Sequence, residues 1–310
     1  MTNDPLASNP DIERTRAHWD SHARAGILSE WTKNDIIAET IYKRITGGES
    51  KFWLNWVFED FLKKKYTRAL SVGCGTGGHE LILARTGLVE KIDAFDLSEA
   101  SIEIARRNAR GAGVANINFF ICDFQSFGDV LLQQKKQYDL VCFLGSLHHV
   151  RDLEAVLGAT SILLAEEGRV VFSEYVGDCY GILSRKKVDI INRLLQCIDQ
   201  EWLNPARPQY QNPDIGHMLN HDPSEATRSA LILPFLEHYF DFELLRPYGG
   251  TILHMLYPSL RHEKINDGSA ASKTILRLLL EMERILYEDA EYIHSDFYVG
   301  VCRKRKSMKK

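Results

Sequence analysis

The 310-residue sequence lacks several features that define common protein classes. Its six cysteines form no C-x-x-C pair and have no metal-ligand spacing, which argues against a disulfide framework and a zinc site. The first residues lack the basic start and apolar run of a signal peptide, and no apolar stretch approaches the ~20 residues of a membrane span. The net charge of −4 is not the basic balance of a nucleic-acid-binding domain. We therefore expect a cytoplasmic protein with no metal, no membrane span and no nucleic-acid partner.

What the sequence does contain is a regular alternation of short apolar runs and amphipathic segments. Buried strands are predicted at 69–73, 91–96, 116–123, 138–145, 168–176, 240–250 and 296–304. Helices are predicted at 12–46, 51–65, 79–87, 98–113, 152–165, 223–240 and 272–291. This spacing predicts an α/β fold: a Rossmann-like, doubly wound, seven-stranded and mostly parallel sheet with an antiparallel edge strand.

Segments outside this alternation divide the chain into parts. The helical pattern of 12–46 stops at Gly47, and the helix at 223–240 should be kinked or broken at Pro234. Residues 177–222 contain three prolines and no strand signal, which indicates a lid over the site. We expect an N-terminal helical arm (1–50), a cofactor-binding core (51–176), a lid or substrate insertion (177–222), the C-terminal part of the core sheet with an inserted helix (223–304) and a basic tail (305–310).

The stretch SVGCGTGGHE at 71–80 is a glycine-rich turn that matches two cofactor templates. Gly73, Gly75 and Gly78 satisfy the G-x-G-x-x-G of a dinucleotide site. Gly73, Gly75 and Gly77 satisfy the G-x-G-x-G of an S-adenosylmethionine site. Asp96, at the end of the next strand, has the spacing of a ribose-binding acid in either template. The turn alone therefore leaves both cofactors open.

Two later features separate the templates. The third strand ends in Cys122-Asp123-Phe124, which places a carboxylate where an adenine amino group could donate to it. The fourth strand runs from YDLV directly into LGSLHHV at 144–150. With the glycine turn, the ribose acid and the adenine acid in this order, residues 66–176 resemble the class I S-adenosylmethionine-dependent methyltransferases, of the small-molecule type with a methyltransferase 11/12/25-like core. A nicotinamide-dependent oxidoreductase is the rival interpretation.

The resemblance implies a set of residues that bind S-adenosyl-L-methionine. They are Gly73, Gly75, Gly77, Asp96, Leu97, Cys122, Asp123, Phe124 and Leu144. Gly78 is then left for close packing at the start of a helix. Many family members have an acid two positions before the first glycine, where this sequence has Ser71. The contact to the cofactor's amino group should therefore be weaker here, or come from elsewhere.

Candidate catalytic and substrate residues lie at the ligand end of the predicted sheet. His148 and His149 follow the fourth strand and Glu174 closes the fifth, so these three are the catalytic candidates. The substrate candidates are Tyr175, His217, Tyr248 and His254. A metal site would need a further ligand that the sequence does not place. Trp19, in the front helix, lies in a segment that the resemblance implies could fold over the cofactor; packing of Trp19 on the core is the favoured alternative.

These features predict methyl transfer to a small-molecule or sugar-like acceptor, with O-methylation by in-line displacement favoured. Two alternatives remain open. The chain could be a cofactor-binding or interaction protein of the same fold without turnover. It could also methylate RNA or protein, for which the support is the basic tail that begins at Arg303. Monomer and homodimer are both compatible with the sequence.

Overall fold

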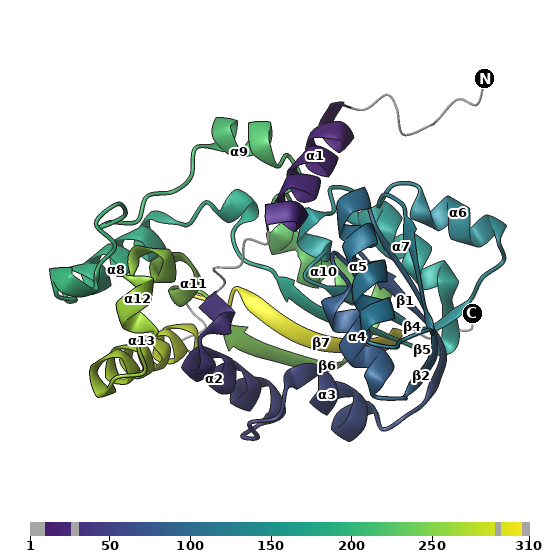
Figure 1. Ribbon diagram of the computed structural model, residues 1–310, viewed down its shortest axis with the longest axis horizontal. Coiled ribbons are helices and arrows are strands. Elements are labelled where there is room, and N and C mark those ends of the chain that lie inside the picture. Colours follow the sequence, from purple (N-terminus) through teal and green to yellow (C-terminus); the bar gives the residue numbers. More distant parts are fainter. Residues whose placement is uncertain (1–9, 26–30, 289–292, 306–310) are drawn as a thin grey trace.

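The computed structural model describes residues 10–25, 31–288 and 293–305. One seven-stranded sheet forms its centre, in the order β3-β2-β1-β4-β5-β7-β6 (Figure 1). Strand β7 is antiparallel to both neighbours, whereas β1 to β5 pair in parallel. The predicted fold class is confirmed, with the antiparallel strand one place inside the edge strand β6. The strands are β1 (Tyr66–Val72), β2 (Val89–Asp96), β3 (Ile117–Ile121), β4 (Tyr138–Leu144), β5 (Leu164–Tyr175), β6 (Phe240–Gly249) and β7 (Phe297–Lys304).

Apolar residues on both sides of the central strands explain why helices cover both faces. Along β4, Cys142 packs in one hydrophobic cluster, while its neighbours Val141 and Phe143 pack in another, as the two-residue period of a strand requires. The first cluster holds α3 (Trp53–Trp56), the π-helix η2 (Val57–Leu62), α4 (Gly78–Arg85) and α5 (Glu99–Gly111). The second holds α6 (Phe127–Gln133), α7 (Leu153–Leu163) and α10 (Ile232–Tyr239).

Local signals at helix ends agree with the structure at some positions and not at others. The Ser98 side chain accepts from Ser101 N and so caps α5, and Gly47 ends α2 (Asp35–Thr46) in the left-handed conformation. The kink expected at Pro234 is wrong. Helix α10 begins at Ile232, so Pro234 lies in its first turn, where no backbone donor is needed. Helix α6 lies in a segment for which no helix was predicted.

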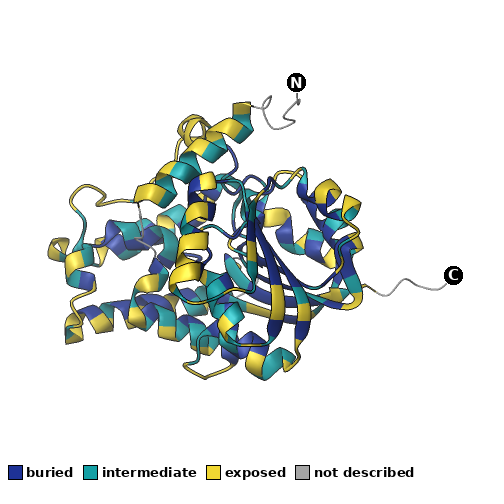
Figure 2. Ribbon diagram, turned by 45° about the vertical axis from the view of Figure 1, so that its right-hand side comes forward, coloured by how far each residue is buried: buried dark blue, intermediate teal, exposed yellow. Residues whose placement is uncertain are grey.

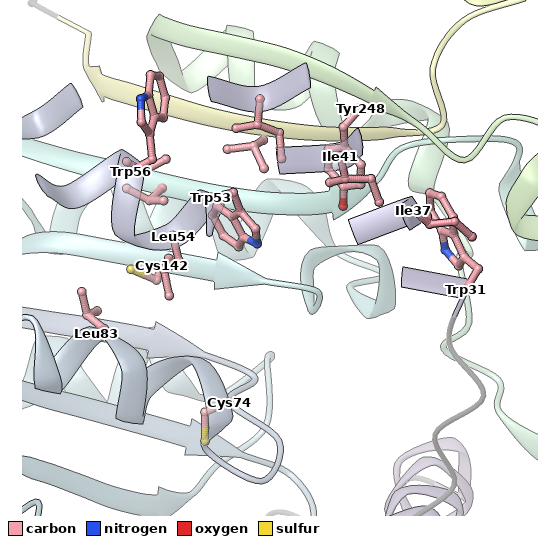
Figure 3. Packing of buried hydrophobic residues seen from close by; sticks show 14 of the residues in the cluster. Trp31, Ile37, Ile41, Trp53, Leu54, Trp56, Cys74, Leu83, Cys142 and Tyr248 are labelled. Carbon is pink, nitrogen blue, oxygen red and sulfur yellow. The ribbon is translucent and has the colours of Figure 1, made fainter. Parts of the chain in front are cut away.

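A helical cap lies beside the sheet and is built from two segments of the chain (Figure 1). The insertion after β5 forms α8 and α9, and the segment between β6 and β7 forms the others. Figure 3 shows the apolar cluster running from Cys142 and Leu83 through Trp53 to Ile41 and Trp31. The cap helices are α8 (Arg185–Gln196), α9 (Ile215–His221), α11 (Leu253–Leu256), α12 (His262–Ile265) and α13 (Ala270–Glu288). The 3-10 turn η4 (Cys179–Gly181) precedes α8, η5 (Gln200–Trp202) follows it, and η7 (Tyr257–Ser259) lies between α11 and α12; η1 (Trp31–Lys33) belongs to the N-terminal segment.

Charged groups anchor this cap to the ends of β6 and β7. Arg44 Nη1 donates to Tyr248 O (3.0 Å) and lies 3.3 Å from Glu283 Oε2 on α13. The other oxygen of Glu283 accepts from the N–H groups of Ile252 (3.0 Å) and Leu253 (2.9 Å). Glu283 is fully buried, so both of its oxygens need these donors.

The first helix, α1 (Pro10–Ala25), lies across the carboxyl ends of the parallel strands and contacts α5 (Figures 1 and 2). Asp20 Oδ1 accepts from Ser98 Oγ (2.6 Å) and from Ala100 N (3.1 Å), which fixes α1 on the start of α5. None of its residues is buried. No described helix has the length and apolar character needed to cross a bilayer.

Candidate active site

The glycine turn after β1 places its three glycines in different surroundings. All three have positive φ: +70° at Gly73, +51° at Gly75 and +79° at Gly77. A Cβ on Gly73 would lie 2.6 Å from Ser146 Cβ, whereas a Cβ on Gly75 would meet nothing within 4 Å. Gly75 is therefore the position at which the backbone itself borders open space.

The close-packing role predicted for Gly78 falls to Gly77 instead, and neither glycine lines the cavity described below. A Cβ on Gly77 would lie 3.0 Å from Ala105 Cβ and 3.0 Å from the Phe119 ring, so this glycine permits close packing of α4 against α5 and β3. A Cβ on Gly78 would meet nothing within 4 Å, so the packing role predicted for Gly78 is wrong.

A buried carboxylate lies behind the turn, although the family's usual acid is replaced by Ser71. The Ser71 hydroxyl donates to Glu80 Oε1 at 2.6 Å, and both side chains are buried. Glu80 Oε2 has no hydrogen-bond partner in the described part of the chain. Burial raises the pKa of Glu80 to about 7, and the Ser71 hydrogen bond opposes that shift. A buried carboxylate from α4 thus lies beside Ser71, but neither residue lines the cavity described below.

Two carboxylates follow β2 and β3, as the sequence predicts. Asp96 accepts from Gly75 N (2.8 Å) and from Ser98 N (2.9 Å), and burial raises its pKa. Asp123 Oδ1 accepts from Gln125 N (2.6 Å) and Ser126 N (2.8 Å), and its Oδ2 accepts from Ser126 Oγ (2.8 Å). Because each carboxylate oxygen has two lone pairs, both residues keep acceptor capacity toward the cavity that they line.

One cavity joins these groups at the carboxyl ends of the strands. Leu144 is not among its lining residues, and Gly145 and Ser146 stand there instead. Trp19 and Arg151 also line it, although sequence reasoning did not place them there. The candidates that do line it are Gly73, Gly75, Asp96, Leu97, Cys122, Asp123, Phe124 and His149.

Helix α1 supplies the cavity wall that sequence reasoning missed. Ile12, Thr15 and Trp19 line the cavity, and their spacing of three and four residues puts them on one helical face. The Trp19 ring meets the His149 ring edge-on with centroids 5.0 Å apart. The expectation that Trp19 packs on the core is therefore wrong. The helical spacing of Ile12, Thr15 and Trp19 was the sequence signal that these three residues share one face.

Glu174 holds the loop after β4 from the neighbouring strand. Its Oε1 accepts from Ser146 N and Leu147 N, both at 2.8 Å, and its Oε2 accepts from His148 Nδ1 at 2.8 Å. Glu174 is buried. Burial lowers the pKa of His148, but the hydrogen bond and charge of Glu174 outweigh burial, so the pKa of His148 is raised. Glu174 is therefore placed to orient His148 and its loop, within the 3-10 turn η3 (Leu147–His149).

His149 faces the segment that follows the lid. Its Nδ1 lies 3.2 Å from Ser224 Oγ and 3.7 Å from both Asp222 Oδ2 and Glu225 Oε2. Burial and the neighbouring His148 lower its pKa well below the usual range. His148, His149 and Glu225 each offer a ligand atom, and these atoms lie within 4.8 Å of one another. Glu225 is a further possible metal ligand beside the two histidines, which the sequence analysis could not place.

Three of the four substrate candidates gather around Phe297 on β7. The ring centroids of Tyr175, Tyr248 and His254 lie 5.2, 5.6 and 5.1 Å from that of Phe297. Tyr248 Oη lies 3.2 Å from Ser173 Oγ. Burial lowers the pKa of His254 to about 4, and its Nδ1 has no partner among the described residues. His217 is apart from this group, exposed on α9 beside His221.

The strand order and the cavity together define the class of protein. The order reverses between β1 and β4, and ligands of open α/β sheets bind outside the strand ends at such a point. The glycine turn, Asp96, Asp123 and Ser146 all border the cavity there. The chain is thus a Rossmann-like α/β protein with its site at the switch point.

Comparisons with known proteins narrow this class. Residues 63–206 match a family model described as a methyltransferase domain. The ubiquinone biosynthesis O-methyltransferase of Acinetobacter baylyi is 31% identical over 120 residues, which cover 39% of this chain and 48% of that protein. The Bordetella avium protein of the same name is 28% identical over 173 residues, which cover 56% of this chain and 66% of that protein. The chain spans about half the length of the first of these relatives.

A solved structure shares the overall fold. The geranyl diphosphate C-methyltransferase of Streptomyces coelicolor superposes with a TM-score of 0.55 at 12% identity, covering 97% of this chain and 100% of that one. Residues 63–206, which carry the glycine turn, Asp96 and Asp123, are thus similar to a methyltransferase domain, and the solved structure shows the same fold.

Proposed function

We propose that this protein transfers a methyl group from S-adenosylmethionine to a hydroxyl group of a small molecule in the cytoplasm. The observation that carries the proposal is the continuity of the cavity. It extends from Gly75, Asp96 and Asp123 to Ser146 and His149. His148 and Glu174 are not among its lining residues, but the His148 ring lies beside that of His149, with centroids 4.1 Å apart. An adenosine-binding end and a pair of histidines that can handle a proton therefore adjoin the same cavity.

The residues present suit this cofactor. The space beside Gly75, where a Cβ would meet nothing within 4 Å, lets the backbone approach a ligand closely. Asp96 and Asp123 keep lone pairs for ribose hydroxyls and for an adenine amino group. Leu97 and Phe124 add apolar walls to the same cavity. When bound, the cofactor supplies the activated methyl group for an in-line displacement.

The chain's own contribution at the other end is orientation and removal of a proton. Glu174 Oε2 accepts the Nδ1 proton of His148, which leaves His148 Nε2 as the basic atom of that ring. A positioned base of this kind contributes on the order of 10²–10⁴ in rate. Orientation of the acceptor adds more, because a fixed geometry replaces an encounter in solution. His148 is thus the proposed base, and Glu174 positions it.

The region beside His148 supports a small, planar or sugar-like acceptor. The Tyr175 ring lies 6.4 Å from the His148 ring, and Tyr175 and Tyr248 both pack against Phe297, although none of the three lines the cavity. The named relatives are O-methyltransferases, which supports a hydroxyl acceptor. The basic tail does not favour a polymer, because Arg303 and Arg305 both pair with Asp241; residues 306–310 lie outside the described part.

Calorimetric titration of the chain with S-adenosylmethionine and its demethylated product tests the cofactor. We expect binding of both and none of a nicotinamide dinucleotide. A panel of catechols, phenols and sugars is then assayed by release of the demethylated product. Tight dinucleotide binding without binding of either sulfur compound would overturn the proposal. Cofactor binding with no turnover on any acceptor would favour the non-catalytic alternative.

A further inference from the structure

Helix α13 has two apolar faces, although a helix on the surface of a protein needs only one. Its outer face exposes large apolar side chains: Leu278 is 59% exposed, Met282 41% and Ile285 57%. The helix lies at the outer edge of the cap, and none of its residues lines the cofactor cavity (Figure 1). The proposed methyl transfer therefore gives no reason for this second face. The buried residues of the inner face are Ser272, Leu276, Leu279, Leu280 and Glu283.

The exposed residues of α13 form a patch instead of being scattered over the surface. Nine large apolar side chains are exposed in the described part of the chain, and three of them are those on α13. The other six lie on six different elements, one on each. Single exposed apolar residues are ordinary, whereas apolar residues gathered on one face mark an interaction site.

The spacing of the patch is that of a seam between two helices. Successive apolar residues on this face are separated by four, three, four and three positions. This alternation is the a/d pattern by which one helix packs against another. A lipid surface imposes no such spacing, so the pattern favours a helix as the partner. The residues of the seam are Ala271, Ile275, Leu278, Met282 and Ile285.

The charged flank beside the seam is balanced in sign. It contains Arg277, Glu281, Arg284 and Glu288. Arg284 pairs with both glutamates, whereas Arg277 has no ion pair in the described part of the chain. An anionic membrane surface would favour a basic flank. Two positive and two negative groups instead suit a partner that carries the same balanced set.

The seam is complementary to itself. When two copies of α13 pack antiparallel about a two-fold axis near Leu280, residues whose numbers add to about 560 come together. Leu278 then meets Met282 of a second copy, and Ile275 meets its Ile285. By symmetry each of these contacts occurs twice. The four apolar residues are thus covered by the same four residues of the other chain.

The charges decide between the two directions in which the helices can pair. In the antiparallel pair the charged flanks face each other, and Arg277 comes beside Glu281 of the second copy. A parallel pair would instead turn Glu281 toward the apolar Leu286 of the other helix. Opposite charges across the rim of an interface fix its direction and register. The antiparallel arrangement is therefore the favoured one.

We propose that a second copy of this chain packs antiparallel on the outer face of α13 and forms a two-fold dimer. One pair of helices lies at the small end of protein–protein interfaces, so the dimer is reversible, with a dissociation constant on the order of 10 µM. The inner face of the same helix carries Glu283, which anchors the cap through Arg44 and through the N–H groups of Ile252 and Leu253. Dimerisation therefore supports the cap from outside.

Sedimentation velocity of the full chain between ~1 and ~200 µM tests the proposal. We expect the parent to pass from monomer to dimer, and Leu278→Glu/Ile285→Glu to stay monomeric over the whole range. Both of these side chains are more than half exposed, so the variant should fold. Ile162→Glu, at a residue of α7 that is 61% exposed, is the matched control and should dimerise like the parent. The melting temperature should rise with concentration in the parent and the control alone.

Thiol cross-linking tests the direction of the pairing. Ile275→Cys and Ile285→Cys are made separately in a chain whose exposed Cys197 is replaced by serine. A mixture of the two variants should be joined by a short bifunctional thiol reagent. Ile275→Cys alone should not, because its two copies would lie about 15 Å apart along the antiparallel pair. Efficient cross-linking of Ile275→Cys to itself would overturn the antiparallel arrangement.

A parent chain that stays monomeric at ~200 µM, or a Leu278→Glu/Ile285→Glu variant that dimerises like the parent, would overturn the proposal. Flotation with vesicles of phosphatidylcholine and phosphatidylglycerol examines the other occupant. Vesicle binding by a monomeric parent, lost in the same variant, would assign the face to lipid and likewise overturn the dimer. The inference does not depend on methyl transfer: a dimer that binds no S-adenosylmethionine would refute the proposed function alone.

Discussion

At the cofactor end of the site, Asp123 accepts from N–H groups only two and three residues further along the chain. At the acceptor end, Glu174 accepts from residues about one strand and helix away, and His149 contacts Ser224 across the whole lid. At the first end Asp123 is held by its own turn and Asp96 by Gly75 in the turn after the neighbouring strand, whereas the second end is built from contacts between more distant segments. Substitutions at the two ends are therefore expected to have different effects: those at the first end on cofactor affinity, and those at the second on kcat or on KM for the acceptor.

Polar groups are satisfied to different degrees in the two ends. Asp96 and Asp123, which line the cavity at the cofactor end, have hydrogen-bond donors on both oxygens. Buried atoms without a partner among the described residues occur behind both ends: Glu80 Oε2 behind the glycine turn, and Asp222 Oδ2 and His254 Nδ1 at the acceptor end. The cavity-lining carboxylates of the cofactor end are therefore the fully satisfied groups of the site.

The largest effect is expected where the cap is anchored. Glu283→Ala leaves Arg44 and two backbone N–H groups without their partner, so the free energy of unfolding should fall by about 3–5 kcal/mol. Urea unfolding measures this change. Glu281→Ala, on the exposed side of the same helix, is the control, and little change in the free energy of unfolding is expected because its ion pair with Arg284 is exposed to solvent. Similar losses in both variants would contradict the anchoring role.

Glu80 should make the stability of the cofactor end depend on pH. Its pKa of about 7 in the folded protein lies above the ordinary 4.5, so the folded state binds the extra proton. This contribution is full at low pH and is lost as pH rises from about 4.5 to 7, by up to ~3 kcal/mol. Glu80→Gln lacks this dependence, so its stability relative to the parent should rise between pH 5 and 8. Parallel curves for the two proteins would refute the prediction. Glu90→Gln, at an exposed residue of β2, is the control.

Gly73→Ala should damage cofactor binding more than folding. The new Cβ would lie 2.6 Å from Ser146 Cβ, at a φ of +70° that costs about 1–2 kcal/mol for a residue with a Cβ. Affinity for the demethylated cofactor should drop at least ~10-fold by calorimetry, because 1.4 kcal/mol is tenfold. Gly78→Ala is the matched control, with open space and no positive φ. Equal affinities for the two variants would argue against a role of Gly73 in shaping the turn.

Glu174→Gln should impair the acceptor end of the site while leaving the cofactor end intact. Its amide oxygen can still accept from Ser146 N and Leu147 N, while its NH₂ group reverses the proton on His148. We expect kcat to fall about 10–100-fold, as for other groups that orient a histidine, with the affinity for the demethylated cofactor within about threefold. A parallel loss of cofactor affinity would show that Glu174 supports the whole site instead of His148.

The smallest effect is expected at Tyr248. Tyr248→Phe removes a hydroxyl that lies 3.2 Å from Ser173 Oγ but keeps the ring against Phe297. The loss should be about 0.5–1.5 kcal/mol, seen in KM for the acceptor with cofactor affinity unchanged. His217→Ala, at an exposed residue outside this aromatic group, should leave KM unchanged. A larger change of KM in His217→Ala than in Tyr248→Phe would indicate that the acceptor binds beside α9 instead.

The sequence predicted the sheet and the local part of the site for physical reasons. Strands buried on both faces give continuous apolar runs, and Asp96 and Asp123 stand at strand ends where parallel strands meet. Glu80, Trp19 and Glu225 were missed because their positions depend on packing between distant segments. Of these, Trp19 had a usable signal in its helical spacing from Ile12 and Thr15.

The position of β7 between β5 and β6 has a consequence for synthesis of the chain. Strand β6 pairs with β7 alone in the described sheet, yet residues 250–296 are translated between the two. At ~5–20 residues per second, β6 waits roughly 2–10 s for its partner, and the free edge of β5, which ends at Tyr175, waits roughly 6–24 s. The parallel strands β1 to β5, with the glycine turn, Asp96 and Asp123, can assemble during that interval. The cofactor end is thus ready on the ribosome before the aromatic group around Phe297 exists, and the newborn chain passes through a stage with an open β-sheet edge.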